Sequence, residues 1–222
     1  MSGRLWRWAG ATGEEREIAR QTVSMIEQKT GQSEPSLWPQ RIPGMRTEHL
    51  SNYHVTEILR DKRPVIIRAV RPDDKGLFID GLTQLSAESI YRRFFGPKKF
   101  TESDLKQATE VDFVNVVALV AVLEKDGEAH IAGGGRYVRI GPGGQTAEVA
   151  FLIGDAFHGL GIGSRLFKHL VSIARDSGIT RFEAEVLPSN EAMLRVFARG
   201  EVPVTRTMTR DSIHVVMDLM GA

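Results

Sequence analysis

Three alternate glycines stand between an apolar segment and an amphipathic segment near the middle of the chain. The stretch Glu148–Ser164 reads EVAFLIGDAFHGLGIGS and has Gly159, Gly161 and Gly163 near its end. Backbone N–H groups in the first turn of a helix lack intrahelical partners and lie at the positive end of the helix dipole. Because glycine lets a ligand touch the backbone, this pattern predicts a cradle for a pyrophosphate group.

Two well-known nucleotide-binding loops fit these glycines less well. A P-loop requires Lys followed by Ser or Thr after its last glycine, whereas Gly163 is followed by Ser and Arg, so the P-loop is excluded. A dinucleotide-binding turn needs an acidic residue about 20 residues further on, and Glu183 and Glu185 meet that requirement. That turn, however, follows its strand at once, whereas residues 155–158 intervene here and several strand-like segments come before. The dinucleotide turn remains a minor alternative.

The stretch resembles the acyl-CoA pyrophosphate loop of the GNAT superfamily of N-acyltransferases, whose pattern is Gln/Arg-x-x-Gly-x-Gly/Ala. Here the pattern begins at His158, in place of Gln or Arg, and has both of its glycines. Leu160 stands where many members carry a basic residue. The resemblance extends over residues 63–219. It implies an α/β (α+β) fold, with a mixed, mostly antiparallel sheet of six to seven strands and helices on both faces.

The resemblance also implies acetyl-CoA as the co-substrate. In the family, the backbone of one strand pairs with the pantetheine arm, the loop binds the pyrophosphate, and a later asparagine contacts CoA or orders the chain near it. The matching residues here are Phe151, Leu152, Ile153, His158, Gly159, Leu160, Gly161, Ile162, Gly163, Ser164 and Asn190. The plainer alternatives are a surface histidine for His158 and a helix cap for Asn190.

Transfer of an acyl group to an amine needs a base, because a lysine with a pKa of about 10.4 is almost wholly protonated at pH 7. Glu148 is the candidate, since its apolar neighbours should raise its pKa by burial. Proteins that resemble this one have their base at the matching glutamate. The alternative is a glutamate that faces solvent or pairs with Arg136. Glu183 and Glu185 alternate with apolar residues, which is typical of an exposed strand face.

The sequence also bears on how the CoA thiolate leaves and on whether an acyl-enzyme intermediate can form. Many family members carry a tyrosine on the final helix as an acid for the CoA thiolate, and the matching residue here is Phe197. The lysine-acetylating members commonly lack this tyrosine as well. Because the chain has no cysteine to carry an acyl group, we expect direct attack in a ternary complex.

A second segment narrows the resemblance. Residues 85–97 read LSAESIYRRFFGP and, with Val111 and Asp112, look like the substrate-side helices of bacterial GNAT enzymes that acetylate protein lysines. The favoured function is therefore acetyl-CoA-dependent acetylation of a protein lysine. A small-molecule amine is an alternative acceptor. A non-catalytic, acyl-CoA-binding regulatory protein is a third possibility, motivated by His158, Leu160 and Phe197.

Composition agrees with a soluble enzyme. Lys and Arg total 29 against 28 Asp and Glu, which gives a net charge of +1 and argues against a nucleic-acid or membrane partner. The absence of cysteine excludes disulfides and cysteine-ligated zinc, and the 6 histidines show no metal-binding spacing, so we expect no metal. Without a signal peptide or an apolar run of about 18 residues, we expect a cytoplasmic protein. The acceptor and the oligomeric state stay open, with a homodimer as one option.

Two regions are expected along the chain. Residues 1–62 form an N-terminal extension with a helix over Glu14–Gln28, and residues 63–222 form the acetyltransferase domain. Ser86 is expected to cap a helix over Ala87–Phe94, and Gly133–Gly135 to mark a bulge or a close approach of backbones. The remaining expected helices are near Asp73–Gly81, Thr101–Glu110 and Ile162–Ser177, with one more led by Asn190. The expected strands are Pro64–Val70, Val114–Leu123, Ala129–Ile140, Thr146–Ile153, Arg181–Leu187, Val202–Met208 and Ile213–Leu219.

Overall fold

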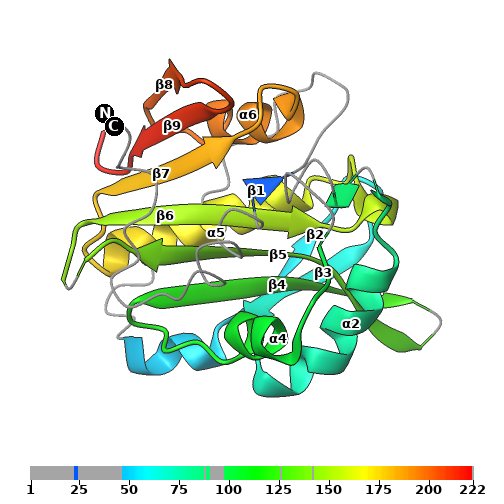
Figure 1. Cartoon of the computed structure of the whole chain (residues 1–222). Helices are drawn as coiled ribbons and strands as arrows, with labels where there is room; N and C mark the ends of the chain where they lie inside the picture. Colours follow the sequence, from blue (N-terminus) through cyan, green and yellow to red (C-terminus); the bar gives the residue numbers. More distant parts are fainter. Residues whose placement is uncertain are drawn as a thin grey trace.

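The computed structural model describes residues 23–24, 47–87, 89–90, 98–125, 127–141 and 143–221. Within these residues a nine-stranded sheet has the order β2-β3-β4-β5-β6-β7-β9-β8, with β1 beside β6 (Figure 1). The strands are β1 Val23–Ser24, β2 His54–Ile58, β3 Pro64–Ala69, β4 Val116–Lys125, β5 Glu128–Arg139, β6 Thr146–Ile153, β7 Arg181–Val186, β8 Val204–Met208 and β9 Ile213–Asp218.

The pairing is mostly antiparallel. In the described part of the chain, only β1 with β6 and β6 with β7 run parallel. The expected fold class is confirmed, but the sheet has more strands than the six to seven expected, because β1 and β2 precede residue 63. β2 was missed because it is a short edge strand whose side chains are only partly buried or exposed, and such a strand lacks a strong apolar pattern.

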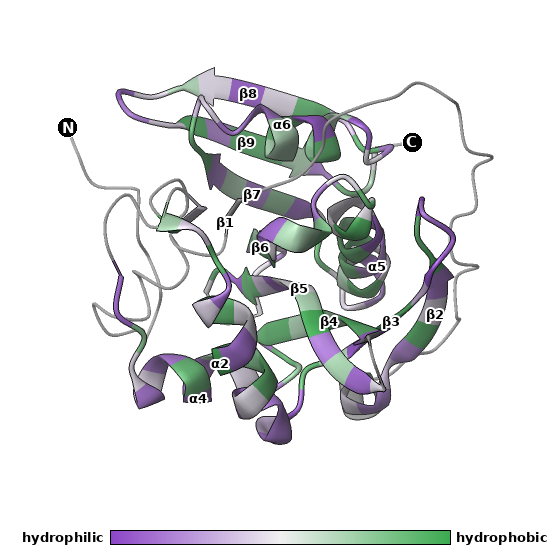
Figure 2. Ribbon diagram, turned by 90° about the vertical axis from the view of Figure 1, so that its right-hand side faces the viewer, coloured by the Kyte–Doolittle hydropathy of each residue, from purple (hydrophilic) through white to green (hydrophobic). Residues whose placement is uncertain are grey.

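Helices cover both faces of the sheet, as expected (Figure 2). On one face α5 buries a row of side chains that includes Leu166, Phe167 and Leu170, at the spacing of a helix that packs along one side. On the other face α2 and α4 lie over β4 and β5 (Figure 1). The helices are α2 Lys75–Thr83, α4 Glu102–Thr109, α5 Ile162–Asp176 and α6 Glu191–Ala198, and the 3-10 helices are η1 Thr47–Asn52, η2 Pro72–Asp74 and η3 Asp155–Phe157.

A bulge lies directly before the three glycines of β5, and the glycines themselves allow a close approach to β6. The register between β4 and β5 shifts between Ala121 and Val122, which is the irregularity of a bulge. A Cβ at Gly133 would lie 2.4 Å from Ile153 Cδ1, and one at Gly135 would lie 2.6 Å from Phe151 Cδ1. The glycines therefore let side chains of β6 lie directly against the backbone of β5.

A buried polar cluster joins β2 to α5. His169 of α5 is fully buried, with Nδ1 2.5 Å from Tyr53 Oη and Nε2 3.2 Å from Glu57 Oε1. Both contacts are satisfied when Nε2–H donates to the carboxylate and Nδ1 accepts from the tyrosine hydroxyl. Burial raises the pKa of Tyr53 to about 12, and the hydrogen bond from His169 lowers the pKa of Glu57. The cluster fixes the early part of the chain against the helix that follows the glycine loop.

The described residues test only part of the N-terminal predictions. Residues 23–24 form β1, so a continuous helix over Glu14–Gln28 is wrong at that point, and the rest of that segment lies outside the described residues. The edge of β6 offers hydrogen bonds that override a weak helical pattern. The division of the chain into two regions at residue 62 stays a prediction. β2, which lies before residue 62, already pairs with β3 of the sheet. The cap at Ser86 is confirmed, since Ser89 N donates to Ser86 Oγ at 3.1 Å. Residues 88 and 91–94 of the expected helix lie outside the described residues.

Candidate active site

β6 and β7 diverge beside the predicted site. Among the described residues they pair only from Thr146 with Arg181 to Glu148 with Glu183. Beyond that point β1 lies along β6, with Val23 opposite Phe151 and Ser24 opposite Leu152. The edge of β6 is thus available to a partner other than β7 directly after Glu148.

Glu148 lies at the point of divergence, on the sheet face that α2 and α4 share. It is opposite Val138 of β5 and Glu183 of β7 and is partly buried. Burial raises the pKa of Glu148 to about 7, while the positive charge of Arg136 opposes the rise. The negative charges of Glu185 and Glu183 add to it, and His214 opposes it. A carboxyl with this pKa exchanges protons readily near neutral pH.

The surroundings of Glu148 contain a hydrogen-bonded group that the sequence did not indicate. Glu185 Oε1 lies 2.7 Å from His214 Nδ1, and Glu185 Oε2 accepts from Ser212 Oγ at 2.6 Å. Glu183 and Glu185 do share one strand face, as expected, but they are partly buried and this face is the one that carries Glu148. Only the pairing of β7 with both β6 and β9 reveals this, and no signal within a single segment could have done so.

The strand predicted to bind the cofactor has β1 beside it at Phe151 and Leu152, and its side chains alternate between the two faces of the sheet. Phe151 and Ile153 are fully buried in the core, with Phe151 packed against Phe167 and Phe197. Leu152 is partly buried and points to the opposite face, across from Gly134 of β5. A ligand along this edge would therefore meet the backbone of Phe151 and Ile153, and the side chain of Leu152.

The glycine loop has the conformation of a phosphate cradle. Gly159 and Gly161 have φ angles of 78° and 83°, a region that other residues rarely adopt. Gly161 caps α5, and the first backbone hydrogen bond of the helix runs from Arg165 N to Gly161 O. The N–H groups of Ile162, Gly163 and Ser164 precede that bond, as expected for a site that binds an anion at a helix start.

Two side chains differ from the simplest expectation for this loop. His158 Nε2 lies 3.3 Å from the Ile153 carbonyl oxygen and 3.6 Å from Asp155 Oδ1, so the ring turns back toward β6. Leu160 is partly buried and packs against the core. Arg60, between β2 and β3, donates to the Gly159 carbonyl oxygen at 3.3 Å and brings a cation to the loop. Sequence analysis missed Arg60 because it lies 99 residues before Gly159.

Asn190 and Phe197 lie on α6, which packs against α5. Asn190 is buried and caps α6, with Oδ1 accepting from Met193 N at 3.2 Å. This is the helix cap that was the alternative interpretation, and a contact with CoA stays a prediction. Phe197 is fully buried, 5.3 Å from Phe167 between ring centroids, and has no hydroxyl group.

The geometry matches a known family. The family model described as "Acetyltransferase (GNAT) family" matches residues 86–200, which include β6, the glycine loop, α5 and α6. The chain belongs to this family. The match confirms the resemblance to the GNAT superfamily that was expected from the sequence. The sheet that diverges beside a glycine loop is the GNAT fold. The family uses acetyl-CoA as co-substrate.

Two curated relatives support this assignment. The chain is 36% identical over 152 residues to Acetyltransferase Pat of Mycolicibacterium smegmatis, which covers 68% of this chain and 44% of that protein. It is 33% identical over 141 residues to Acetyltransferase PA5475 of Pseudomonas aeruginosa, which covers 63% of this chain and 75% of that protein. The match thus spans less than half of Pat.

Solved structures agree with these relatives. The GNAT domain of S. lividans PAT superposes with a TM-score of 0.67 at 35% identity, covering 76% of this chain and 98% of that one. A cAMP-binding acyltransferase from Mycobacterium smegmatis superposes with a TM-score of 0.52 at 28% identity, covering 80% of this chain and 54% of that one.

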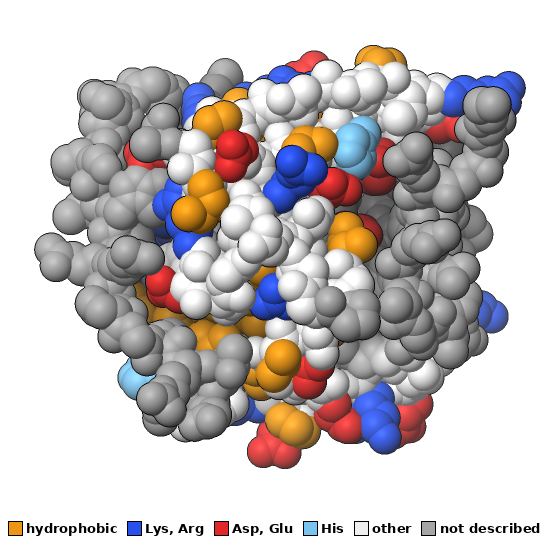
Figure 3. All heavy atoms as spheres, turned by 90° about the vertical axis from the view of Figure 1, so that its left-hand side faces the viewer, with side chains coloured by type: hydrophobic (Ala, Val, Ile, Leu, Met, Phe, Trp, Pro, Cys, Tyr) orange, Lys and Arg blue, Asp and Glu red, His pale blue; other side chains and the backbone are white. Residues whose placement is uncertain are grey.

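Across the described residues, no group of three or more His, Asp or Glu side chains is arranged to hold a metal ion. No helix among the same residues is long and apolar enough to span a membrane. Acidic and basic side chains are mixed over the face drawn in Figure 3, in keeping with the net charge of +1.

Proposed function

We propose that the protein transfers the acetyl group of acetyl-CoA directly to an amine, and that this amine is a protein lysine side chain. The observation that carries the proposal is the position of Glu148 at the divergence of β6 and β7, with a pKa raised to about 7. A base with this pKa is ionised in a large fraction of molecules at neutral pH, yet still binds a proton well.

The chemical step follows from these positions. Glu148 accepts a proton from the acceptor ammonium, and the freed nitrogen attacks the thioester carbonyl carbon. The C–N bond forms, the C–S bond breaks and CoA leaves as a thiolate, while the nitrogen loses its second proton to water as the amide forms. An N–H group on the β6 edge beside Leu152 would stabilise the charge that develops on the carbonyl oxygen. Phe197 cannot protonate the thiolate, so the thiolate leaves without that acid or takes a proton from water.

The glycine loop fits the pyrophosphate of acetyl-CoA. Its first three helical N–H groups converge without a side-chain cap at Gly161, and Arg60 adds positive charge nearby. Each hydrogen bond to a charged group contributes about 1.5–3 kcal/mol, so three such donors supply about 4.5–9 kcal/mol toward binding before the cost of association is subtracted. Residues 158–164 would hold the phosphates, and the backbone of residues 151–153 would pair with the pantetheine arm.

The choice of a lysine acceptor has its own support. It rests on the resemblance of residues 85–97 to the substrate-side helices of lysine-acetylating enzymes, and on the similarity to acetyltransferases named Pat. We place the reaction in the cytoplasm, where acetyl-CoA and acceptor proteins meet and where a chain without cysteines needs no oxidising compartment.

Mass spectrometry after incubation with acetyl-CoA and a panel of proteins and small amines tests the proposal. We expect acetyl-lysine on a defined protein, and a loss of about 100- to 10,000-fold in Glu148→Gln with acetyl-CoA binding retained. Acetylation of small amines alone would show that the acceptor is a small-molecule amine and not a protein lysine. Tight binding without any product would favour a non-catalytic acyl-CoA-binding role, and unchanged transfer in Glu148→Gln would remove Glu148 from the mechanism.

A further inference from the structure

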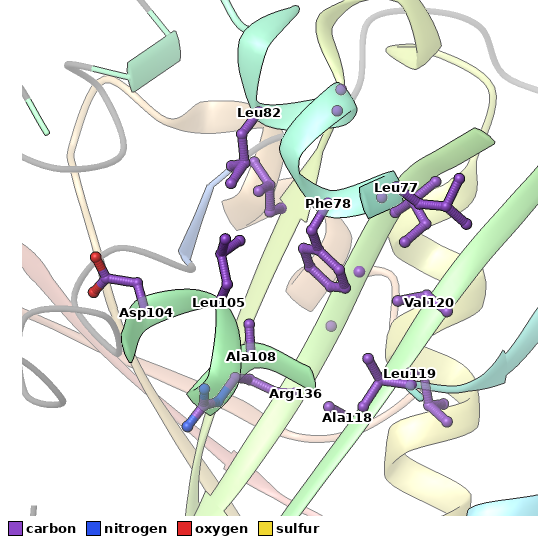
Figure 4. A pocket seen from close by; sticks show the side chains of 18 of the residues that line it. Leu77, Phe78, Leu82, Asp104, Leu105, Ala108, Ala118, Leu119, Val120 and Arg136 are labelled. Carbon is purple, nitrogen blue, oxygen red and sulfur yellow. The ribbon is translucent and has the colours of Figure 1, made fainter. Parts of the chain in front are cut away.

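An apolar cavity of about 100 Å³ lies between the sheet and the two helices that cover the Glu148 face. Phe78 of α2 and Leu105 and Ala108 of α4 form one wall (Figure 4). Val120 of β4 and Leu152 of β6 form the opposite wall. The cavity is thus bounded by elements that are far apart in the sequence.

The middle of the sheet wall is bare backbone. Val120, Gly134 and Leu152 are opposite one another on β4, β5 and β6, so they form one row across the sheet. The central member of this row has no side chain, and a Cβ there would lie 3.2 Å from the Leu119 carbonyl oxygen. A glycine between two branched apolar side chains therefore leaves bare backbone on this wall of the cavity.

Among the described residues that line the cavity, Asp104 and Arg136 are charged. The positive charge of Arg136 acts on the Glu148 carboxyl and opposes the rise of its pKa by burial. Asp104 accepts from Lys98 Nζ at 3.1 Å and from Thr101 N at 2.7 Å, so its charge is already compensated. Glu148, which the acceptor ammonium must reach, does not line the cavity. A lysine acceptor therefore has its polar contact elsewhere on this face.

One end of the cavity reaches the strand that is expected to carry the thioester. Leu152 and Gly154, at the end of β6 and just beyond it, both line the cavity. An acyl group attached to a pantetheine arm that pairs with the β6 edge would start beside Leu152. From there the row of Val120, Gly134 and Leu152 leads away from the loop and underneath α2 and α4.

We propose that this cavity binds the hydrocarbon chain of acyl-CoA thioesters longer than acetyl-CoA, with the chain lying over Gly134 between Leu152 and Val120. The proposal rests on the proposed function and extends it to the acyl donor. An apolar cavity of about 150 Å³ is known to stay dry and to bind benzene, so a space of this size suits a short acyl chain. The two carbons of an acetyl group would leave much of it empty.

Burial of each methylene group is worth about 0.8 kcal/mol, which corresponds to about a fourfold gain in affinity. Butyryl-CoA has two more methylene groups than acetyl-CoA and should bind roughly 15-fold more tightly if both enter the cavity. Isothermal titration calorimetry of the full chain with acetyl-, propionyl-, butyryl- and hexanoyl-CoA measures this series. The same thioesters in the transfer assay give kcat/KM for each donor.

Ala108→Phe fills the cavity from α4, and Ala108→Leu is a milder variant that fills it in part. We expect Ala108→Phe to bring butyryl-CoA to within about twofold of acetyl-CoA while leaving acetyl-CoA binding and transfer unchanged. Gln107→Phe is the matched control, because it adds the same ring to the neighbouring residue of α4, which does not line the cavity. This control should keep the chain-length dependence of the wild type.

The outcomes separate the two proposals. Equal affinity for all four thioesters in the wild type, with acetyl transfer intact, would overturn the acyl-chain site and leave the proposed function in place. Failure of transfer from every donor, with the binding series as expected, would overturn the function and leave the site. If Ala108→Phe raised only the KM of the acceptor, the cavity would belong to the acceptor and the inference would be wrong.

Discussion

The rate of a reaction that depends on Glu148 should follow the ionisation of that carboxyl. Only the carboxylate accepts a proton, and the pKa is raised to about 7 mainly by burial. We therefore expect kcat/KM to rise with pH through about 7 and to level off above it. Glu185→Gln removes a negative charge that raises the pKa of Glu148, so it should move this limb to lower pH.

Steady-state rates between pH 5.5 and 9 would measure this rising limb in the wild type and in Glu185→Gln. Glu102→Gln, at the start of α4 and exposed, is the control and should leave the profile where it is. A profile that stays in place in Glu185→Gln would contradict the electrostatic account of Glu148, and a rate independent of pH would contradict its role as base.

The same carboxyl should weaken the fold at high pH. Because burial raises the folded-state pKa of Glu148 above its unfolded value of 4.5, the folded state binds the proton more tightly. Its full contribution to stability is present below about pH 4.5 and is lost as pH rises to about 7. One pKa unit corresponds to about 1.36 kcal/mol, so the loss is on the order of 3 kcal/mol.

Glu148→Gln should remove this loss. Urea unfolding at pH 5 and pH 8 should show the variant gaining up to about 3 kcal/mol relative to the wild type at the higher pH. The expected combination is a variant that is inactive but more stable, which is common where a site keeps a buried charge for function. If the free energy of unfolding differed between the variant and the wild type by the same amount at pH 5 and pH 8, Glu148 would be well solvated in the folded state.

The carboxylate of Asp155 ties the chain just before the glycine loop to the start of the helix that follows α2. Asp155 of η3 accepts from Ser86 N at 2.6 Å and from Ser89 Oγ. Ser86 begins the helix that follows α2, and Asp155 lies just before the loop. The hydrogen bonds from Ser86 and Ser89 lower the pKa of Asp155 against the effect of burial.

Asp155→Ala should leave both donors without their acceptor. A lost bond to a charged group costs about 1–3 kcal/mol, and partial exposure places the expected cost near the lower end. Hydrogen exchange should show faster exchange at Ser86 and Ser89, with a small fall in the urea midpoint. Asp211→Ala, at an exposed residue between β8 and β9, is the control. Unchanged exchange at Ser86 would show that the helix start is held by other contacts.

Elements with a long local pattern were predictable, and those defined by distant pairing were not. β4, β5, β6 and α5 follow from runs of apolar residues that bury whole strands or one side of a helix. β1 has two residues, and it exists only as a partner of β6. The same distinction applies to the candidate site. The glycine loop, the β6 residues and Glu148 follow one another in the sequence and could be predicted from it. Arg60 and His214 are distant in the sequence and come close to these residues only in the folded chain.

The two faces of the sheet differ in what they carry. The face under α5 holds the core, in which Phe151, Phe167 and Phe197 pack edge to face. The other face carries Glu148 and the cavity under α2 and α4, with a smaller apolar cluster around Val120. Side chains alternate along β6, so this strand supplies core residues to one face and the candidate base Glu148 to the other.

The pairing of β1 with β6 has a consequence for cofactor binding. Val23 and Ser24 are opposite Phe151 and Leu152, the residues whose backbone would pair with the pantetheine arm. Two partners cannot use the same N–H and C=O groups, so β1 must leave before the cofactor pairs there. The apparent affinity for acetyl-CoA is then lowered by the fraction of molecules in which β1 is in place.

Deletion of residues 1–30 should therefore strengthen acetyl-CoA binding. At net values of about 0.5–1.5 kcal/mol per backbone hydrogen bond, the loss of two such bonds corresponds to a gain of about 5- to 150-fold. A double substitution, Val23→Pro with Ser24→Pro, removes the β1 N–H groups within the full chain and should act in the same direction. Ser33→Pro, in the same extension but outside β1, is the control. Calorimetric affinities within twofold of the wild type for both variants, at unchanged thermal stability, would show that β1 does not compete with the cofactor.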